Sequence, residues 1–187
     1  MNYQFLEKKI ERCAICSIKT EVEANVKYGS MYGYGGNTIM VCGIAPSYIR
    51  GSSSKYTIST DHSNYTAGIL FNMFDEIKWP VKKTYFTNLV KCSLPDNRKP
   101  NNQELEACFN YWFVQELFLV NPVAIICLGN FVYEYLQIKE WNIPIELYKV
   151  YHFSYISRRK DVYNEWKMEW IRIGKEIREL TGFGRSR

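Results

Sequence analysis

Short apolar runs alternate along the chain with longer stretches in which apolar residues recur at helical spacing. Four runs are typical of buried strands in a parallel sheet and cover residues 38–43, 84–90, 123–128 and 144–150. The stretches with helical spacing predict helices over residues 3–13, 64–77, 103–120, 131–136 and 161–180. This alternation predicts an α/β fold in one domain spanning residues 1–187, with a mostly parallel four-stranded sheet sandwiched between helices.

The predicted strands end in segments that carry polar or glycine residues. Gly43–Ser47, Asn88, Gly129 and His152 each follow one of the strands. Parallel strands place their carboxyl ends at one edge, where open α/β sheets bind their ligands. The sequence therefore predicts a site at this edge. Beyond Asn88 the chain enters a proline-flanked loop, and Asn102 is predicted to cap the helix that follows.

Composition sets few limits on function. At 187 residues and 47% hydrophobic content the chain is long enough for one well-formed core. It has no apolar run long enough to cross a membrane, and its first residues are charged, so we expect an intracellular, cytoplasmic protein without a signal peptide. A net charge of +5 permits nucleic acid as a partner without requiring it. We expect a monomer.

The six cysteines fall into two groups. Cys42 and Cys127 lie inside apolar strand-like runs and are predicted to be core residues. The others form a C-x2-C pair and a C-x15-C pair, and these are Cys13, Cys16, Cys92 and Cys108. Four thiolates suit a [4Fe–4S] cluster, and a four-cysteine zinc site needs the same ligands. Either metal centre would pack the N-terminal helix onto the core.

Several motifs resemble those of the uracil-DNA glycosylase superfamily, specifically its iron–sulfur (family 4) branch. The segment TNLVKCSLPDNRKP at 87–100 resembles the signature T-N-x-V-K-C-x-P-P-x-N-R-x-P, and Glu104–Cys108 matches the E-x-x-x-C that follows it. GIAPS at 43–47 resembles the GEAPG loop, ICLGNFVYEYL resembles the L-G-x-x-A helix entry, and HFS at 152–154 resembles H-P-S. The resemblance covers roughly residues 10–160, in the same order.

This resemblance implies a monofunctional DNA glycosylase. Such an enzyme flips a pyrimidine out of DNA, uracil by default, and hydrolyses its N-glycosidic bond to leave an abasic site. The resemblance also favours the [4Fe–4S] cluster over zinc as the group held by the four cysteines. We expect that cluster to have a structural role without redox turnover.

The resemblance and the chemistry of the reaction together assign roles to the site residues. The carboxamide of Asn88 can donate and accept at once, which suits the O4 and N3–H of a pyrimidine. His152 would donate a hydrogen bond to the negative charge on the departing base. Contacts to the DNA backbone are expected from Ser154, Arg158 and Arg159. Lys91 and Arg98 are either phosphate contacts or ordinary solvated charges.

The chain departs from the family pattern at its expected carboxylate. Ile44 stands where the family loop has Glu, and Ile44-Ala45 is closer to the GLAP loop of a neighbouring branch, which places an Asp further downstream. Asp61, with His62 beside it, is the nearest candidate for that catalytic role. The alignment across residues 48–66 does not decide between these possibilities.

The predicted base-binding pocket also departs from the family pattern. The base-stacking Phe of the family falls on Ser63, so Tyr65 or Tyr48 would have to supply the ring. Ser47 stands where relatives that exclude thymine carry Tyr, although it is equally explained as a small residue in a tight turn. With Gly43, Ile44 and Ala45 these residues form the predicted base-binding set.

Three alternatives to uracil excision remain from the sequence. A roomier pocket at Ser47 would admit a hydroxymethylated or glucosylated pyrimidine, as expected of an antiviral defence enzyme acting on phage DNA. The loss of the Glu at position 44 would also fit a catalytically inactive nucleic-acid binder. A zinc-stapled structural protein is the third.

Overall fold

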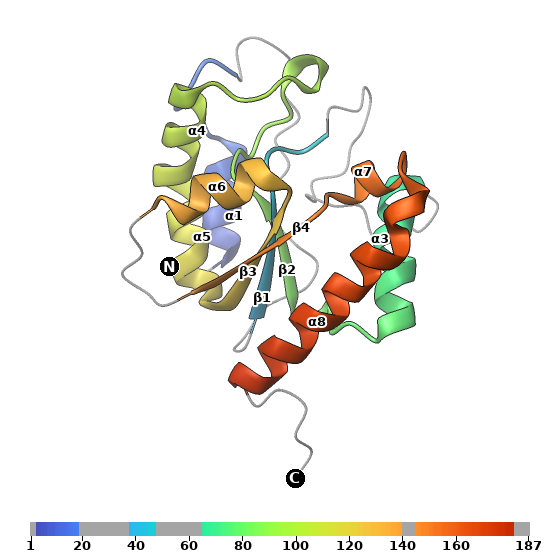
Figure 1. The fold of residues 1–187 in the computed structure, drawn as a ribbon. Coiled ribbons are helices and arrows are strands. Elements are labelled where there is room, and N and C mark those ends of the chain that lie inside the picture. Colours follow the sequence, from blue (N-terminus) through green and yellow to red (C-terminus); the bar gives the residue numbers. More distant parts are fainter. Residues whose placement is uncertain (1–2, 19–37, 48–64, 140–144, 182–187) are drawn as a thin grey trace.

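The protein was analysed as a computed structural model, which describes residues 3–18, 38–47, 65–139 and 145–181. Its centre is a four-stranded sheet with the order β2-β1-β3-β4 (Figure 1). The strands are β1 (Thr38–Gly43), β2 (Thr84–Asn88), β3 (Pro122–Leu128) and β4 (Glu146–Val150). All three strand pairs are parallel, so the predicted "mostly parallel" sheet is parallel throughout the described chain.

Helices cover both faces of this sheet (Figure 1). They are α1 (Tyr3–Glu11), α3 (Tyr65–Ile77), α4 (Asn102–Cys108), α5 (Val114–Val120), α6 (Asn130–Gln137), α7 (Phe153–Ile156) and α8 (Tyr163–Thr181). Short 3-10 turns lie at Val81–Lys83, Pro95–Asn97 and Lys160–Val162.

Strand residues point alternately into two separate cores, as the period of a β-strand requires. In β1, Met40 and Cys42 belong to the core that also holds residues of α1, α4, α5 and α6. Ile39 and Val41 belong to the other core, with residues of α3, α7 and α8. Both faces of β1, β2 and β3 are buried, which explains why β1 and β3 are apolar without alternation, whereas the edge strand β4 is partly exposed.

The helix predicted over residues 103–120 is continuous but irregular. Between α4 and α5 lies a π-helical turn, Phe109–Phe113. The predicted cap was wrong by one residue, because Asn101 and not Asn102 caps α4. Its side-chain oxygen accepts from the N–H of Glu104 at 2.9 Å, and the Glu104 carboxylate accepts from the N–H of Asn101 at 2.8 Å. This reciprocal capping box satisfies two helix-end donors.

The ends of two elements bear on the site. β2 stops at Asn88 rather than at residue 90, although the N–H groups of Leu89 and Val90 still donate to the carbonyls of Gly43 and Ile44, both at 2.9 Å. After β4 the chain forms α7, a short helix that the sequence did not predict. His152 is its N-cap residue, so the helix orients the imidazole directly.

The N-terminal helix α1 packs onto the core by apolar contacts. Leu6 and Ile10 are buried in the same core as Leu117 of α5. The segment that bears Cys13 and Cys16 follows α1 directly and packs against this core. Hydrophobic burial alone therefore attaches α1, and a metal centre would add to that attachment.

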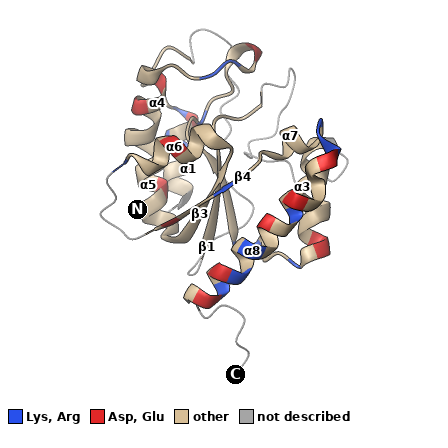
Figure 2. Ribbon diagram, in the orientation of Figure 1, with Lys and Arg blue, Asp and Glu red and all other residues tan. Residues whose placement is uncertain are grey.

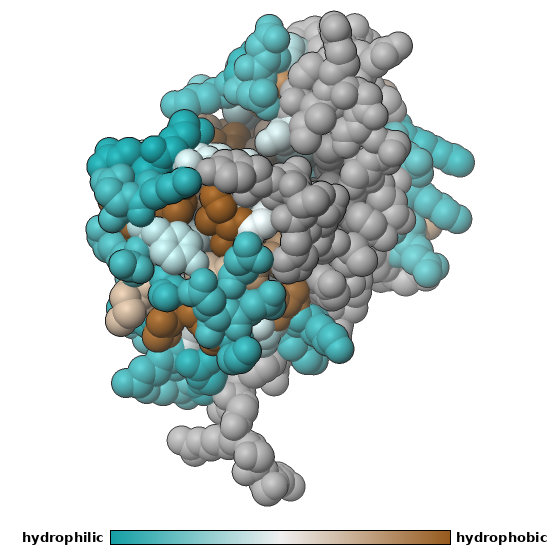
Figure 3. Space-filling view, turned by 90° about the vertical axis from the view of Figure 1, so that its right-hand side faces the viewer, coloured by the Kyte–Doolittle hydropathy of each residue, from teal (hydrophilic) through white to brown (hydrophobic). Residues whose placement is uncertain are grey.

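The closing helix α8 has the predicted buried face, formed by Trp166, Trp170, Ile173 and Ile177. Basic Lys and Arg side chains are interspersed with acidic Glu along its outer surface (Figure 2), where Arg172 pairs with both Glu169 and Glu176. On the face of the molecule shown in Figure 3, hydrophilic side chains surround a smaller hydrophobic area. No helix among the described residues is long and apolar enough to span a membrane.

Candidate active site

A cavity of about 550 Å³ lies at the carboxyl edge of the sheet. Its walls come from the segments that follow three of the strands and from the proline-flanked loop. The lining residues are Ile44, Ala45, Pro46, Ser47, Leu94, Asn97, Arg98, Lys99, Leu128, Gly129, Asn130, Phe131, His152, Ser154 and Arg158. Six residues that the sequence predicted for the site thus share one cavity, namely Ile44, Ala45, Ser47, His152, Ser154 and Arg158.

Asn88 is not among the lining residues, although its register partner Gly43 directly precedes the lining residue Ile44. It is paired in register with Gly43 and only 6% exposed. A Cβ atom added to Gly43 would overlap the Oδ1 atom of Asn88. The glycine therefore makes room for the carboxamide, which explains why the loop begins with this residue. The two residues form one unit at the end of β1 and β2.

The imidazole of His152 is held in a defined orientation. Its Nδ1 atom accepts a hydrogen bond from the backbone N–H of Ser154 at 3.1 Å, and the hydroxyl oxygen of Ser154 lies 2.8 Å from the same atom. A backbone N–H can only donate, so Nδ1 carries no proton. The neutral ring is therefore protonated at Nε2, the nitrogen left available as a hydrogen-bond donor.

The surroundings of His152 also favour its neutral form. Burial, followed by the nearby positive charge of Arg158, lowers its pKa from 6.5 to about 4. Both effects act in the same direction, since each disfavours a second positive charge. At neutral pH the ring is an uncharged donor.

The basic residues near the cavity differ in how far they are already paired. Arg98 forms two hydrogen bonds with the Glu104 carboxylate, at 2.6 and 2.8 Å, and these tie the loop to α4. Arg159, outside the cavity lining, makes a similar pair with Asp161. Lys99 lies over the ring of Phe131, 5.8 Å from its centroid. Lys99 and exposed Arg158 are thus better placed than Arg159 to meet an anionic ligand.

Lys91 is neither a phosphate contact nor a solvated surface charge, so both sequence interpretations were wrong. Its side chain is 2% exposed and makes an ion pair with Glu116, which is 1% exposed, at 2.5 Å. Sequence alone missed this because the partner lies 25 residues away on another element.

Part of the predicted site falls outside the described residues. Asp61, Ser63, His62 and Tyr48 are not described, and Tyr65 is described only as the first residue of α3. No Asp or Glu is among the described residues that line the cavity. A catalytic carboxylate is therefore not located here, and Asp61 stays a prediction.

The lining residues to which the sequence assigned no role include Asn97, Lys99, Asn130 and Phe131. Asn97 and Lys99 lie in the loop whose motif was recognised, where Asp96 and Asn97 adopt left-handed backbone conformations (φ 51° and 54°). Asn130 and Phe131 follow Gly129 at the end of β3. Their position directly after Gly129, which was predicted to lie at the site edge, was an available signal.

The four candidate metal ligands lie in one region of the fold. Cys92 and Cys108 are buried in the core against which Cys13 and Cys16 pack. Two N–H groups point at the sulfurs: the indole Nε1 of Trp112 lies 3.1 Å from Cys13 Sγ, and the backbone N of Lys91 lies 3.3 Å from Cys108 Sγ. Such donors stabilise thiolate and cluster sulfur.

The spacing of these cysteines bears on which metal centre they would hold. Among the described residues, no group of three or more His, Cys, Asp or Glu side chains is arranged to hold a metal ion. Zinc requires four sulfurs close around one atom, whereas in an iron–sulfur cluster each thiolate binds a different iron. Burial raises the pKa of the Cys108 thiol to about 12, so any metal must displace a firmly held proton. The four thiols are candidate ligands for either centre, a [4Fe–4S] cluster or zinc.

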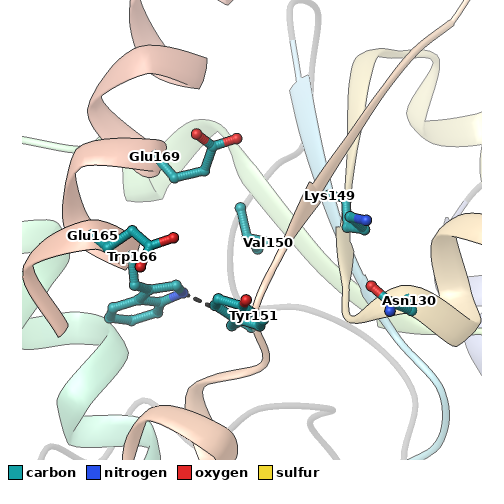
Figure 4. A pocket seen from close by; sticks show the side chains of 7 residues that line it. All are labelled: Asn130, Lys149, Val150, Tyr151, Glu165, Trp166 and Glu169. Atoms are coloured by element: carbon teal, nitrogen blue, oxygen red, sulfur yellow. Dashed lines mark hydrogen bonds between the residues drawn. The ribbon is translucent and has the colours of Figure 1, made fainter. Parts of the chain in front are cut away.

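A second cleft, of about 320 Å³, lies between β4 and α8 (Figure 4). It shares Asn130 with the first cavity, and its walls include Lys149, Tyr151, Glu165 and Glu169. The two carboxylates make this wall unfavourable for a polyanion. The first cavity, with its basic rim and the ordered imidazole, is the better candidate for a nucleic-acid site.

Fold and site together define an α/β protein with a basic cavity at the carboxyl edge of a parallel sheet, into which the segment after β4 brings a neutral imidazole. Residues 32–172 match the model of the uracil DNA glycosylase superfamily. The chain belongs to this superfamily.

Curated relatives agree with that assignment. The chain is 25% identical over 126 residues to the type-4 uracil-DNA glycosylase of Archaeoglobus fulgidus, a match that covers 57% of the chain and 63% of that protein. It is 47% identical over 45 residues to the enzyme of the same name from Pyrobaculum aerophilum, covering 24% of the chain and 22% of the relative. These matches span less than two thirds of the relatives' length.

Proposed function

We propose that this protein is a monofunctional DNA glycosylase that excises a flipped pyrimidine, uracil by default, and leaves an abasic site. The observation that carries the proposal is the neutral, Nε2-protonated His152 in a cavity rimmed by basic residues. Superfamily membership supports the reaction class, and the named relatives support the base.

The carboxamide of Asn88 would recognise the flipped base. Its Oδ1 can accept from N3–H of uracil while its NH2 group donates to O4. The close approach to Gly43 restricts the amide to a narrow range of positions. Because the amide is buried, a base that leaves it unpaired would be bound poorly.

His152 would act on the leaving base. Cleavage of the C1′–N1 bond leaves the electron pair on the pyrimidine, as an anion with charge on O2. The Nε2–H of His152 would donate a hydrogen bond to that oxygen. A water oxygen would then bond to C1′, and the proton that this water loses would neutralise the pyrimidine anion. A neutral ring can fill this role, because Nδ1 accepts from the N–H of Ser154 and Nε2 keeps its proton to donate.

The four cysteines would hold a [4Fe–4S] cluster, the cofactor implied by the family 4 resemblance. Such a cluster, when bound, would link two segments of the chain structurally, with no part in bond cleavage. Cys13 and Cys16 follow α1, and Cys92 and Cys108 flank the loop that lines the cavity. The protein's own residues would then orient that loop, mainly through the Arg98–Glu104 pair.

A direct assay tests the function. The protein is incubated with a duplex containing one uracil, and abasic sites are detected as strand breaks after alkali. We expect cleavage at the uracil, and cleavage slower by about 100-fold to 1,000-fold with His152→Ala at the same protein concentration. Tight DNA binding by a wild-type protein that cleaves none of the substrates would instead indicate the nucleic-acid binder.

A modified pyrimidine is the second candidate, favoured by the size of the cavity. Its volume of about 550 Å³ falls among pockets that hold drug-sized ligands, about 300–1,000 Å³, and exceeds the needs of one pyrimidine ring. Asn97, Asn130 and Ser47 add polar groups suited to hydroxyls. Phage DNA with hydroxymethylated or glucosylated bases, tested beside the uracil duplex, separates the two. Cleavage of the uracil duplex alone would exclude the defence function.

A further inference from the structure

The buried lysine at position 91 reaches back to the end of β2. Its Nζ donates to the backbone carbonyl oxygen of Asn88 at 2.6 Å, to the hydroxyl of Thr87 at 2.8 Å, and to the Glu116 carboxylate at 2.5 Å. An ammonium group has three donors, and each is used here. One of these three contacts holds the main chain of the residue proposed to read the base.

The acceptor side of this network is equally complete. The Glu116 carboxylate accepts from the Thr87 hydroxyl at 2.7 Å and from the Tyr85 hydroxyl at 3.0 Å, as well as from Lys91. All these groups are buried. A buried polar network with every partner satisfied specifies one arrangement of its backbone, because any other leaves a polar group unpaired.

The network contacts β2 on the face of the sheet that α5 covers. Tyr85 and Thr87 both contact Glu116 of α5, so their side chains face the layer of α5. Successive side chains alternate along a strand, so the carboxamide of Asn88 points to the opposite layer. There it lies against Gly43. Lys91 thus holds the main chain on one side while the side chain is presented on the other.

Lys91 is itself anchored beside the candidate metal ligands. Its backbone N–H donates to Cys108 Sγ at 3.3 Å, and its ammonium group lies 5.3 Å from the centroid of the Phe113 ring. The residue therefore joins the cysteine region to the strand end through its main chain and its side chain respectively.

We propose that Lys91 is a positioning residue, which fixes the carboxamide of Asn88 for base recognition by holding its backbone carbonyl. This inference rests on the proposed function. Stability alone does not explain the lysine, since a buried ion pair often adds nothing over well-packed apolar residues of similar size. An apolar residue cannot replace the hydrogen bond that the Lys91 ammonium group donates to the Asn88 carbonyl oxygen.

The test compares a single with a double substitution. Lys91→Met leaves the Glu116 charge buried without its partner, so we expect lower thermal stability and lower activity together. Lys91→Met combined with Glu116→Gln removes both charges, and glutamine can still bond the hydroxyls of Tyr85 and Thr87. We expect the double variant to regain most of its thermal stability, with kcat for uracil excision still at least about 10-fold below wild type and KM for DNA within about 2-fold.

Hydrogen exchange gives a readout that is independent of catalysis. The amides of Leu89 and Val90 donate to the carbonyls of Gly43 and Ile44, so their protection reports the position of the strand end. We expect at least about 10-fold faster exchange at these two amides in both variants, while β3 amides keep wild-type protection. Lys139→Met is the matched control, because Lys139 also pairs with a carboxylate, Glu106, and its ammonium group lies over the rings of Phe109 and Tyr135.

The outcomes separate this inference from the proposed function. A double variant that recovers both kcat and amide protection would overturn the positioning role of Lys91. Wild-type protein that excises no base refutes the proposed function, and the exchange experiment then still decides whether Lys91 holds the Asn88 segment. Unchanged amide exchange at Leu89 and Val90 in both Lys91 variants would refute the positioning role of Lys91.

Discussion

Gly43 and Asn88 occupy the same position in the register of β1 and β2, and the Oδ1 atom of Asn88 fills the space that a Cβ on Gly43 would need. The glycine at the end of β1 thereby determines where the side chain at the end of β2 can lie. Since the proposed base reader depends on this contact, the pair offers the most direct test of the site.

Gly43→Ala is expected to displace the carboxamide of Asn88. We predict at least about a 10-fold loss of kcat/KM on uracil-containing duplex, with a stability cost of about 1–3 kcal/mol from overpacking. Steady-state kinetics and thermal unfolding measure the two effects. Gly174→Ala is the control, because its Cβ would meet Trp79 at 3.1 Å in the distant core. It should lower stability and leave kcat/KM unchanged, and equal losses in both variants would contradict the prediction.

The low pKa of His152 predicts an unusual pH profile. Because the ring is neutral above about pH 4, kcat should show no ionisation near pH 6.5 and should fall only on approach to pH 4. An activity profile from pH 4 to 8 measures this. His152→Ala should lower kcat by about 100-fold to 1,000-fold, the usual cost of losing an oxyanion donor. An acid limb centred at pH 6.5 would show that the folded protein does not suppress protonation.

The same shift predicts how stability depends on pH. The folded state holds His152 neutral down to about pH 4, whereas the unfolded chain protonates it near pH 6.5. Between these values the unfolded state binds more protons, so the His152 contribution to stability falls as the pH is lowered from 6.5 to 4. Unfolding by urea at several pH values measures the slope. His152→Gln removes this titration and should show a flatter dependence over that window.

The basic residues should differ in their contribution to DNA binding. Lys99→Ala and Arg158→Ala should each weaken binding and reduce the slope of log K against log salt by about 1, as expected for one lost phosphate contact. Arg159→Ala should do less, because the guanidinium is already paired with Asp161. Fluorescence anisotropy across a salt series measures all three. A larger loss of DNA affinity in Arg159→Ala than in Lys99→Ala or Arg158→Ala would contradict this prediction.

The cysteines predict a visible cofactor. Protein purified without oxygen should be brown, absorb near 400 nm and contain about four irons per chain. Cys13→Ser or Cys108→Ser should lose the colour and iron, whereas Cys42→Ala should keep both, because Cys42 is a buried strand residue. Iron and zinc analysis by mass spectrometry measures the content. Colourless protein with one zinc would favour the zinc-stapled alternative.

Local patterns were enough to predict most of the fold. Continuous apolar runs indicate the buried strands. Apolar residues at helical spacing indicate the helices of 65–77 and 163–181. Helix ends depend on single hydrogen bonds, which explains the error at Asn101. The short helix after His152 has too few residues to leave a periodic signal.

The sequence by itself determined the parallel sheet, the edge at which the strand ends meet, and the motifs that identify the superfamily, because these depend on periodicity and on residues close in the chain. Only the tertiary structure decided that Lys91 is buried against Glu116, that Asn88 is confined by Gly43, and that Asn130 and Phe131 line the cavity. The physical reason is that a charge or an amide acquires its role from partners on other elements, and the folded packing alone brings those partners within contact distance.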